Sequence, residues 1–351
     1  MTGHAAGGPG DCPPGPAPNR NGPFAAGDQV QLTDPKGRMH QIVLREGGEF
    51  HTHRGSLKHD ELIGAPEGSV VVAAGGTAYV ALRPLLADYT LAMKRGAALI
   101  YPKDAAQILA YADIFPGARV LEAGAGSGAL SCWLLRVIGA EGELISFERR
   151  ADFARIAQAN VEKYFGVRPP QWRLRVGDFS VPGTPEFSLT SHPDSPAVPA
   201  PVTAADVPAS YDRVILDMLA PWECVGDAAA ALVPGGLICV YVATTTQLSR
   251  VVEELRAHGG FFEPAAGETL ARGWHVDGLA VRPEHRMIGH TAFLVTARRL
   301  APGVTAPPRR RRPSKGAHPE TGEPGPEITP AGPEITPAAP PAPAAPPAPA
   351  D

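Results

Sequence analysis

Residues 119–130 read RVLEAGAGSGAL, and this stretch decides the fold of the central part of the chain. A buried strand is expected at 119–122 and a helix at 128–138, so the chain passes from one to the other through three glycines. Glycines at 124, 126 and 128 permit a tight turn and let a ligand approach the backbone closely. A strand, a glycine-rich turn and a helix in this order are typical of a crevice that holds a nucleotide-like cofactor.

Three carboxylates in and after that turn indicate which cofactor binds there, S-adenosylmethionine. Glu122 precedes the first glycine, where it would repel a pyrophosphate but attract the positively charged amino-acid end of S-adenosylmethionine. Glu148 ends the next strand, about 20 residues past the last glycine, where a carboxylate can accept both ribose hydroxyls. Asp178 can accept a hydrogen bond from the adenine amino group while Phe179 packs against the ring. Each acid alone could be a helix cap. All three acids together, in register with the glycine turn, favour a cofactor site.

The rest of the chain divides by composition into folded and unfolded segments. From about residue 96 onward, buried strands alternate with amphipathic helices, which predicts a doubly wound (Rossmann-like) α/β fold with a parallel sheet over 91–300. Short strands separated by turns predict a small N-terminal β domain over 23–90. The segment 180–210 is rich in proline and is expected to be a surface insertion. Residues 1–22 and the Pro/Ala-rich tail at 301–351 are expected to be disordered.

The individual elements follow from hydrophobic periodicity and turn residues. In the α/β part, strands are expected at 119–122, 143–147, 172–176, 213–217, 236–242 and 290–297. Helices are expected at 103–112, 128–138, 151–164, 223–232 and 246–257. In the β domain, strands are expected at 29–32, 39–44, 69–72 and 79–82.

Charge and cysteine content exclude several classes of protein. The formal net charge of −4 gives no global sign of nucleic-acid binding, although five arginines between 272 and 299 could form a basic rim or an ordinary solvated surface. The four cysteines form no CxxC pair, which argues against a zinc ribbon and favours a reducing, cytoplasmic setting. Alternating His51 and His53 lack cysteines or paired carboxylates at ligand spacing, so no metal site is expected. No apolar run reaches the roughly 20 residues of a membrane span.

Seven further motifs extend well beyond the cofactor turn. They are FHTHRG at 50–55, HDELIG at 59–64, LRP at 82–84, YPKD at 101–104, DMLAPW at 217–222, YVATTTQ at 241–247 and RMIGH at 286–290. With them, the chain closely resembles the bacterial and archaeal tRNA (adenine-58-N1)-methyltransferases, the TrmI family, over about 24–300. The resemblance implies a small N-terminal β domain joined to a class I methyltransferase domain, assembled as a homotetramer. The tails and the insertion lie outside it.

The resemblance also implies an activity, the transfer of a methyl group from S-adenosylmethionine to N1 of adenine 58 in the T-loop of tRNA. The N1 lone pair attacks the methyl group directly, so catalysis should rest on positioning and electrostatics and not on a base. Asp217 is expected to accept a hydrogen bond from the adenine amino group. Tyr101 and Tyr241 match positions that shape the adenine pocket. The target base, stacked inside the folded T-loop, should have to be extruded into the site.

The residues expected to hold the cofactor are therefore mostly those of the turn and of the strand ends. They are Glu122, Gly124, Gly126, Ser127, Gly128, Ala129, Leu130, Glu148, Phe153, Asp178, Phe179, Asp217 and Gln107. For Gln107, a contact with cofactor or substrate and a plain surface role are both open.

Two other functions compete with this interpretation. The first is a class I methyltransferase acting on a protein or a small molecule, against which the motifs outside the cofactor turn argue. The second is a catalytically silent tRNA-binding subunit, which is expected to have lost its cofactor residues. Here Glu122, Glu148, Asp178 and Asp217 all remain.

Overall fold

The computed structural model describes residues 21–53, 55–96, 98–179 and 210–307. The expectations for the extreme N-terminus, for the insertion up to residue 209 and for the tail from residue 308 lie outside these residues. No helix in the described part of the chain is both long enough and apolar enough to cross a membrane.

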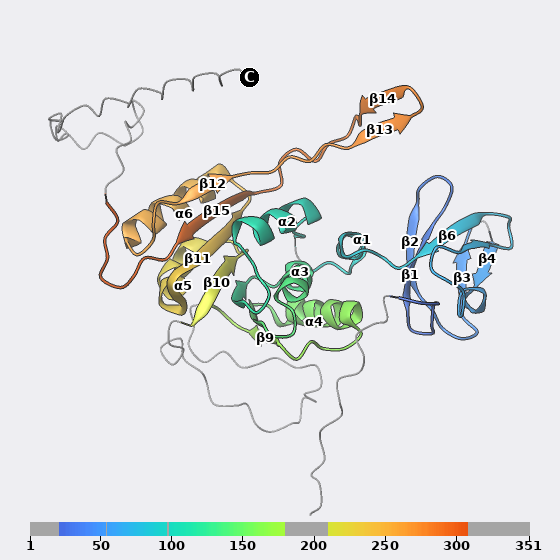
Figure 1. Cartoon of the computed structure of the whole chain (residues 1–351), viewed down its shortest axis with the longest axis horizontal. Coiled ribbons are helices and arrows are strands. Elements are labelled where there is room, and N and C mark those ends of the chain that lie inside the picture. The colour runs from blue at the N-terminus through green and yellow to red at the C-terminus, as the bar shows by residue number, and fades with distance from the viewer. Residues whose placement is uncertain (1–20, 54, 97, 180–209, 308–351) are drawn as a thin grey trace, which may run out of the picture. The chain divides into compact units, whose positions relative to one another are not determined.

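A seven-stranded sheet forms the centre of the larger part of the structure (Figure 1). Its strands, in spatial order, are β12 (Ala265–Gly267), β15 (Phe293–Arg298), β11 (Leu232–Val242), β10 (Tyr211–Leu216), β7 (Arg119–Ala123), β8 (Glu143–Glu148) and β9 (Trp172–Val176). The strands from β11 to β9 are parallel, whereas β15 runs antiparallel to β11 and to β12.

The strand order reverses between β7 and β10. The chain leaves β7 towards β8 and β9, and then returns to the opposite side of β7 to form β10. In open α/β sheets, ligands bind outside the carboxyl ends of the strands at such a reversal, because the connections there diverge to opposite faces and leave a crevice. The glycine turn after β7 and Asp217 after β10 both lie at this point.

Helices cover both faces of this sheet. One face packs against α1 (Leu86–Ala92), α2 (Pro102–Tyr111), α3 (Ala129–Ile138) and α4 (Ala151–Phe165), and the other against α5 (Val225–Ala231) and α6 (Thr245–His258) (Figure 1). Neighbouring residues of β7 point to opposite faces, as a strand requires. Val120 packs in the first core with Leu134, whereas Leu121 packs in the second with Val251.

The doubly wound α/β fold predicted from the sequence is confirmed, with differences at the ends of elements. The last strand begins at Phe293 and not at residue 290, so His290 and Thr291 precede it. Pro221–Cys224 forms a short 3-10 helix, and α5 begins only at Val225. An antiparallel hairpin of β13 (Trp274–Asp277) and β14 (Ala280–Pro283) was not predicted.

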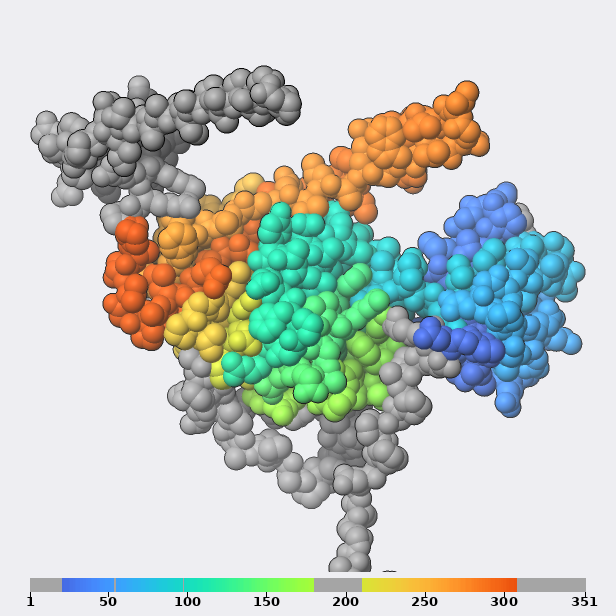
Figure 2. Space-filling model, in the orientation of Figure 1, coloured from blue at the N-terminus to red at the C-terminus, as the bar shows by residue number. Residues whose placement is uncertain are grey.

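This hairpin, the outer orange segment of Figures 1 and 2, has no buried face. Every residue of β13 is exposed, and Trp274 and Val276 keep 59% and 68% of their surface accessible. β13 alternates apolar and polar residues over only four positions, Trp274-His275-Val276-Asp277, which is too short a run to distinguish a strand from a loop.

A separate four-stranded antiparallel sheet forms in the N-terminal region. Its order is β2 (Met39–Val43), β1 (Gln29–Thr33), β6 (Ala78–Leu82) and β5 (Val70–Val72), and the hairpin of β3 (Glu49–Thr52) and β4 (Gly55–Lys58) accompanies it. The motif at residues 50–55 thus builds a hairpin. The ring of His40 packs against Phe50 and Tyr79, and His59 is buried and accepts a hydrogen bond from the backbone of Arg45, so both histidines support the packing of this β region.

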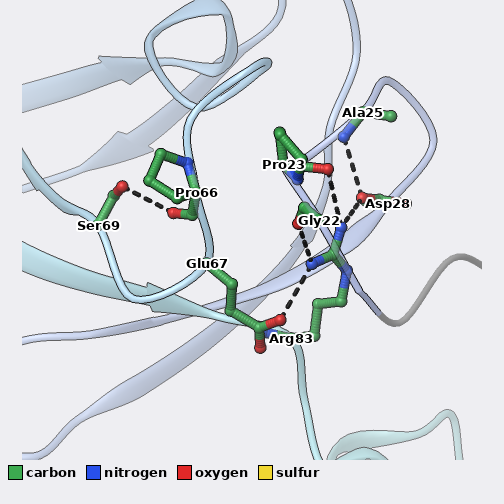
Figure 3. Close-up of polar contacts among 8 residues, drawn as sticks. All are labelled: Gly22, Pro23, Ala25, Asp28, Pro66, Glu67, Ser69 and Arg83. Carbon is green, nitrogen blue, oxygen red and sulfur yellow. Dashed lines mark hydrogen bonds and ion pairs between the residues drawn. The ribbon is translucent and has the colours of Figure 1, made fainter.

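Arg83, at the end of β6, ties the first described residues to this sheet (Figure 3). Its guanidinium donates to the carbonyl oxygens of Gly22 and Pro23 at 3.0 and 3.1 Å. It also pairs with the carboxylates of Asp28 at 2.7 Å and Glu67 at 3.0 Å. The planar fork of arginine suits several acceptors at once, so the LRP motif at residues 82–84 has a structural role here.

Candidate active site

A cavity of about 610 Å³ opens at the carboxyl ends of β7, β8 and β10. Most of the residues predicted to bind the cofactor line it: Gly124, Gly126, Ser127, Ala129, Leu130, Glu148, Phe153, Asp178, Phe179 and Asp217. Glu122 and Gly128 stand behind the turn and do not line the cavity. Gln107 lies on α2 and lines neither this cavity nor the neighbouring one, so its role stays a prediction.

The glycine turn brings the ends of β7 and β10 into contact. Gly124 has φ +90°, and a Cβ added there would lie 1.7 Å from the backbone oxygen of Asp217. The amide of Asp217 donates to the carbonyl of Ala123 at 2.8 Å. Gly128, at φ +77°, begins α3, and a Cβ there would lie 2.9 Å from the carbonyl oxygen of Ala157. The absence of a side chain at Gly124 therefore lets the ends of β7 and β10 approach each other at the crevice. The absence of a side chain at Gly128 lets α3 pack closely on α4.

Glu122 is an almost fully buried carboxylate, with 1% of its surface exposed. Its Oε2 accepts hydrogen bonds from the hydroxyls of Ser131 at 2.6 Å and Ser146 at 2.5 Å, whereas Oε1 has no partner among the described residues. Burial raises the pKa of Glu122 to about 7, although the two serines act in the opposite direction. A buried carboxylate suits a cationic ligand in the adjoining cavity, because a nearby positive charge offsets the cost of ionising the buried group.

Glu148 is anchored by the backbone on both of its oxygens. Oε2 accepts from the amide of Gly126 and Oε1 from the amide of Arg150, each at 2.9 Å. A carboxylate oxygen has two lone pairs, so each can still accept a hydroxyl from a ligand. This fixed orientation at the end of β8 fits a carboxylate that holds the two hydroxyls of a ribose.

Asp178 and Phe179 border the same cavity after β9. Asp178 is paired with the guanidinium of Arg149. The ring of Phe179 meets that of Phe147 edge-on, with centroids 5.3 Å apart. A carboxylate beside two fixed aromatic rings suits a purine, which offers a flat apolar face and an amino donor.

A second cavity of about 480 Å³ adjoins the first, and Asp217 lines both. Tyr101 and Tyr241 line this second cavity, together with Ile288 and His290. The structure thus brings the three predicted catalytic residues to one place. Burial, and then the nearby carboxylates Glu122 and Glu148, raise the pKa of Asp217 to about 7.

Other residues of the second cavity were not predicted. Beside it, the buried carboxylate of Asp104 accepts hydrogen bonds from Lys103, Thr291 and Tyr241. The YPKD motif contained Asp104, but only its tyrosine was given a role, and nothing in the local sequence singled out Thr291.

His290 lies between two acceptors at the rim of the second cavity. Its ring nitrogens contact the carboxylate of Glu268 at 2.9 Å and the carbonyl oxygen of Ala243 at 2.8 Å. The backbone oxygen, followed by the carboxylate, raises the pKa of His290. Glu268 and His290 are the two ends of the segment that carries the β13–β14 hairpin. Their contact closes this segment, and the contact of His290 with Ala243 ties it to the end of β11.

The predicted basic rim contains fewer free arginines than the sequence indicated. Arg298 donates to the carbonyl of Gly235, and Arg299 donates to several backbone carbonyls, so both have structural partners. Arg272, Arg282 and Arg286 are exposed on or beside the hairpin.

Replacing Glu122 with Gln should change two measurable properties, the pH dependence of stability and the affinity for the cofactor. Because the pKa of Glu122 is raised in the folded protein, its contribution to stability is complete below its unfolded pKa of about 4 and is lost as the pH rises through about 7. The melting temperature of the cofactor-free protein should therefore fall from pH 5 to pH 8, and less steeply in the variant. At pH 8 the variant should bind S-adenosylmethionine at least about 10-fold more weakly, since the negative charge behind the turn is lost. Thermal melts and calorimetric titrations across this pH range measure both effects, and unchanged affinity would remove Glu122 from the cofactor site.

Family models and a curated relative match most of the chain. The family model described as "TrmI-like N-terminal" matches residues 22–71, and the model described as "tRNA methyltransferase complex GCD14 subunit" matches residues 77–166 and 202–282. The tRNA (adenine(58)-N(1))-methyltransferase TrmI of Thermus thermophilus is 35% identical over 268 residues, which cover 76% of this chain and 95% of that protein.

Two solved structures share the architecture over most of their length. A SAM-dependent O-methyltransferase of Thermotoga maritima superposes with a TM-score of 0.69 at 26% identity, covering 82% of this chain and 96% of its own. The tRNA (m1A58) methyltransferase TrmI of Aquifex aeolicus superposes with a TM-score of 0.64 at 27% identity, covering 80% and 99%. The fold is that of class I S-adenosylmethionine-dependent methyltransferases. From its sequence matches over both regions and from this fold, the chain belongs to the TrmI family of tRNA (adenine-58-N1)-methyltransferases.

Proposed function

We propose that the chain transfers the methyl group of S-adenosylmethionine to N1 of adenine 58 in the T-loop of tRNA. The observation that carries this proposal is the position of Asp217, which lines both the cavity suited to the cofactor and the adjoining cavity with Tyr101 and Tyr241. A donor in one cavity and a planar acceptor in the other would meet at this carboxylate. The relative of Thermus thermophilus, by its printed name, modifies adenine 58 at N1.

The first cavity and the turn behind it offer a group for each part of the proposed cofactor. Glu148 would accept the ribose hydroxyls, and Glu122, behind the turn, would act on the cationic amino-acid end through its charge. Asp178 would accept the adenine amino group, with Phe179 against the ring. When bound, S-adenosylmethionine supplies an electrophilic methyl group on a sulfonium. The glycine turn at 124–128 keeps side chains out of the crevice and so lets the ligand approach the backbone.

The second cavity would hold the target base. N1 of adenine already carries a lone pair at neutral pH, so the protein need not remove a proton to create the nucleophile. Asp217 would accept a hydrogen bond from the exocyclic amino group, which stabilises the positive charge that develops on the base during the transfer. Tyr101 would pack against the base, which must leave the T-loop stack to reach the cavity.

We further propose a homotetramer in which the β13–β14 hairpin contacts a neighbouring copy. Four apolar side chains of this hairpin, Trp274, Val276, Leu279 and Val281, are at least half exposed. Exposed apolar surface of this kind is typical of a protein–protein contact. Arg282 and Arg286 beside them would then border the path of the tRNA backbone. A cytoplasmic location suits a tRNA substrate and the free thiols of Cys132, Cys224 and Cys239.

Substrate competition with labelled S-adenosylmethionine tests this function against its rivals. Whole tRNA, unstructured peptides and small catechols would be offered to the purified protein separately and then together. The proposal expects label in tRNA alone. Transfer to a peptide or to a catechol hydroxyl, without transfer to tRNA, would favour a protein or small-molecule methyltransferase. Cofactor binding and tRNA binding without transfer to any of them would favour a silent RNA-binding subunit.

A further inference from the structure

A buried polar cluster lies beside the second cavity, and the mechanism described above does not use it. Asp104 has 2% of its surface exposed. Its Oδ1 accepts from the ammonium of Lys103 at 2.6 Å, and its Oδ2 accepts from the hydroxyls of Thr291 at 2.6 Å and Tyr241 at 3.2 Å. These residues come from α2, from the end of β11 and from the segment before β15, so three distant parts of the chain meet at one carboxylate.

The hydrogen-bond directions in this cluster are fixed by its charges. The three donors of the Lys103 ammonium are used by Asp104, by the hydroxyl of Thr291 at 2.7 Å and by the carbonyl of Thr269 at 2.7 Å. The hydroxyl of Thr291 thus accepts from Lys103 and must donate to Asp104. An ionised carboxylate is only an acceptor, so the hydroxyl of Tyr241 must also donate to Asp104.

This arrangement leaves the phenolic oxygen of Tyr241 with lone pairs but no hydrogen for a ligand. Burial, followed by the charge of Asp104, raises the pKa of Tyr241 well above its usual range, so the phenol stays neutral and does not act as a base. Tyr241 and Asp217 line the same cavity. When Asp217 is ionised, both residues can only accept hydrogen bonds from a ligand in this cavity, which suits a ligand with two donors on one atom, such as an exocyclic amino group.

We propose that Asp104, held by Lys103 and Thr291, is a positioning residue that fixes Tyr241 as a hydrogen-bond acceptor for the exocyclic amino group of the target base. Asp217 accepts one hydrogen of that group and Tyr241 accepts the other. A base with a carbonyl beside the attacked nitrogen meets two acceptors instead and is repelled. This inference rests on the proposed function and goes further by naming what selects the amino-bearing base.

The test compares tRNA transcripts that carry adenosine or purine riboside at position 58. Purine riboside keeps N1 but lacks the amino group. Wild type should prefer adenosine by about 100-fold in kcat/KM, since two hydrogen bonds are lost. Tyr241→Phe and Asp104→Asn should each reduce this preference by about 10-fold, mainly through kcat on adenosine, with KM for S-adenosylmethionine unchanged. Thr291→Val should reduce it by roughly 3-fold, and Thr296→Val, the same change within β15, should leave it unchanged.

A double-mutant cycle separates positioning from a purely structural role. If Asp104 acts through Tyr241, the double variant Asp104→Asn/Tyr241→Phe should discriminate no worse than Tyr241→Phe alone. If the two losses add, or if Asp104→Asn slows both substrates equally, Asp104 only supports the fold and the inference is wrong. Thermal melts of every variant identify unfolding, and Thr291→Val provides the milder test should Asp104→Asn not fold. A wild type inactive on adenosine tRNA would instead overturn the proposed function itself.

Discussion

Replacing Asp217 with Asn should lower kcat for tRNA methylation by about 100-fold or more, while binding of S-adenosylmethionine changes much less. The amide keeps the shape of the side chain but loses the negative charge that would stabilise the methylated base. Because the pKa of Asp217 is raised to about 7, mainly by burial, the carboxylate is partly protonated below neutral pH. Wild-type kcat/KM should therefore rise with pH through about 7 and level off above it. Single-turnover methyl transfer between pH 5.5 and 9 measures both the rate and the profile.

Glu223→Gln is a matched control for this variant. Glu223 lines the first cavity, but it follows Pro221 in the short 3-10 helix and lines no part of the second cavity. The Glu223→Gln change should leave the rate within about 3-fold of wild type, because the net contribution of a single polar contact is small. An Asp217→Asn variant that keeps the wild-type rate would remove Asp217 from the mechanism. An unchanged rise in rate near pH 7 in that variant would assign the titration to another group.

Gly124→Ala should abolish cofactor binding and lower stability by several kcal/mol. Its Cβ would lie 1.7 Å from the backbone oxygen of Asp217, and the residue's φ of +90° is one that L side chains rarely adopt. β7 and β10 are paired in the centre of the sheet, so neither strand can move away from the added Cβ without breaking that pairing. The glycine turn must therefore deform instead. Calorimetric titration with S-adenosylmethionine and thermal melting measure the two losses.

Gly139→Ala controls for placing a side chain at a positive φ without any steric clash. Gly139 has φ +68°, ends α3, and has no atom within 4 Å of an added Cβ. Its replacement should cost about 1–3 kcal/mol in stability and leave methylation intact. If Gly124→Ala bound the cofactor as wild type does, the crevice described between β7 and β10 would not be the cofactor site.

The parts of the fold that the sequence predicted are those with a local physical signature. The turn after β7 was readable because strand, glycines and helix follow one another within twelve residues, 119–130. Central parallel strands such as β10, with its run Val214-Ile215-Leu216, were readable because burial on both faces makes them apolar. The β13–β14 hairpin has no buried face and was missed, although Asp277-Gly278 stands at its turn.

The site was predicted only as far as single motifs describe it. Most residues proposed to contact cofactor and base lie at strand ends, where position in the fold determines function, whereas Tyr101 caps the start of α2. The Asp104 cluster joins α2 to Thr291, 187 residues away, and to Tyr241, 137 residues away. Such contacts depend on the antiparallel placement of β15 beside β11, which no local pattern reports. The buried state of Glu122, with one oxygen unpaired, likewise emerges only from the packed structure.

Mapping the methylated position in tRNA tests the central claim most directly. Unmodified tRNA would be incubated with S-adenosylmethionine and either wild type or Asp217→Asn, and the product located by nuclease digestion and mass spectrometry. The account predicts N1-methyladenosine at position 58 with wild type, and at least about 100-fold less per unit time with the variant. Methylation at another atom or position, or no methylation of tRNA by the wild type, would contradict it.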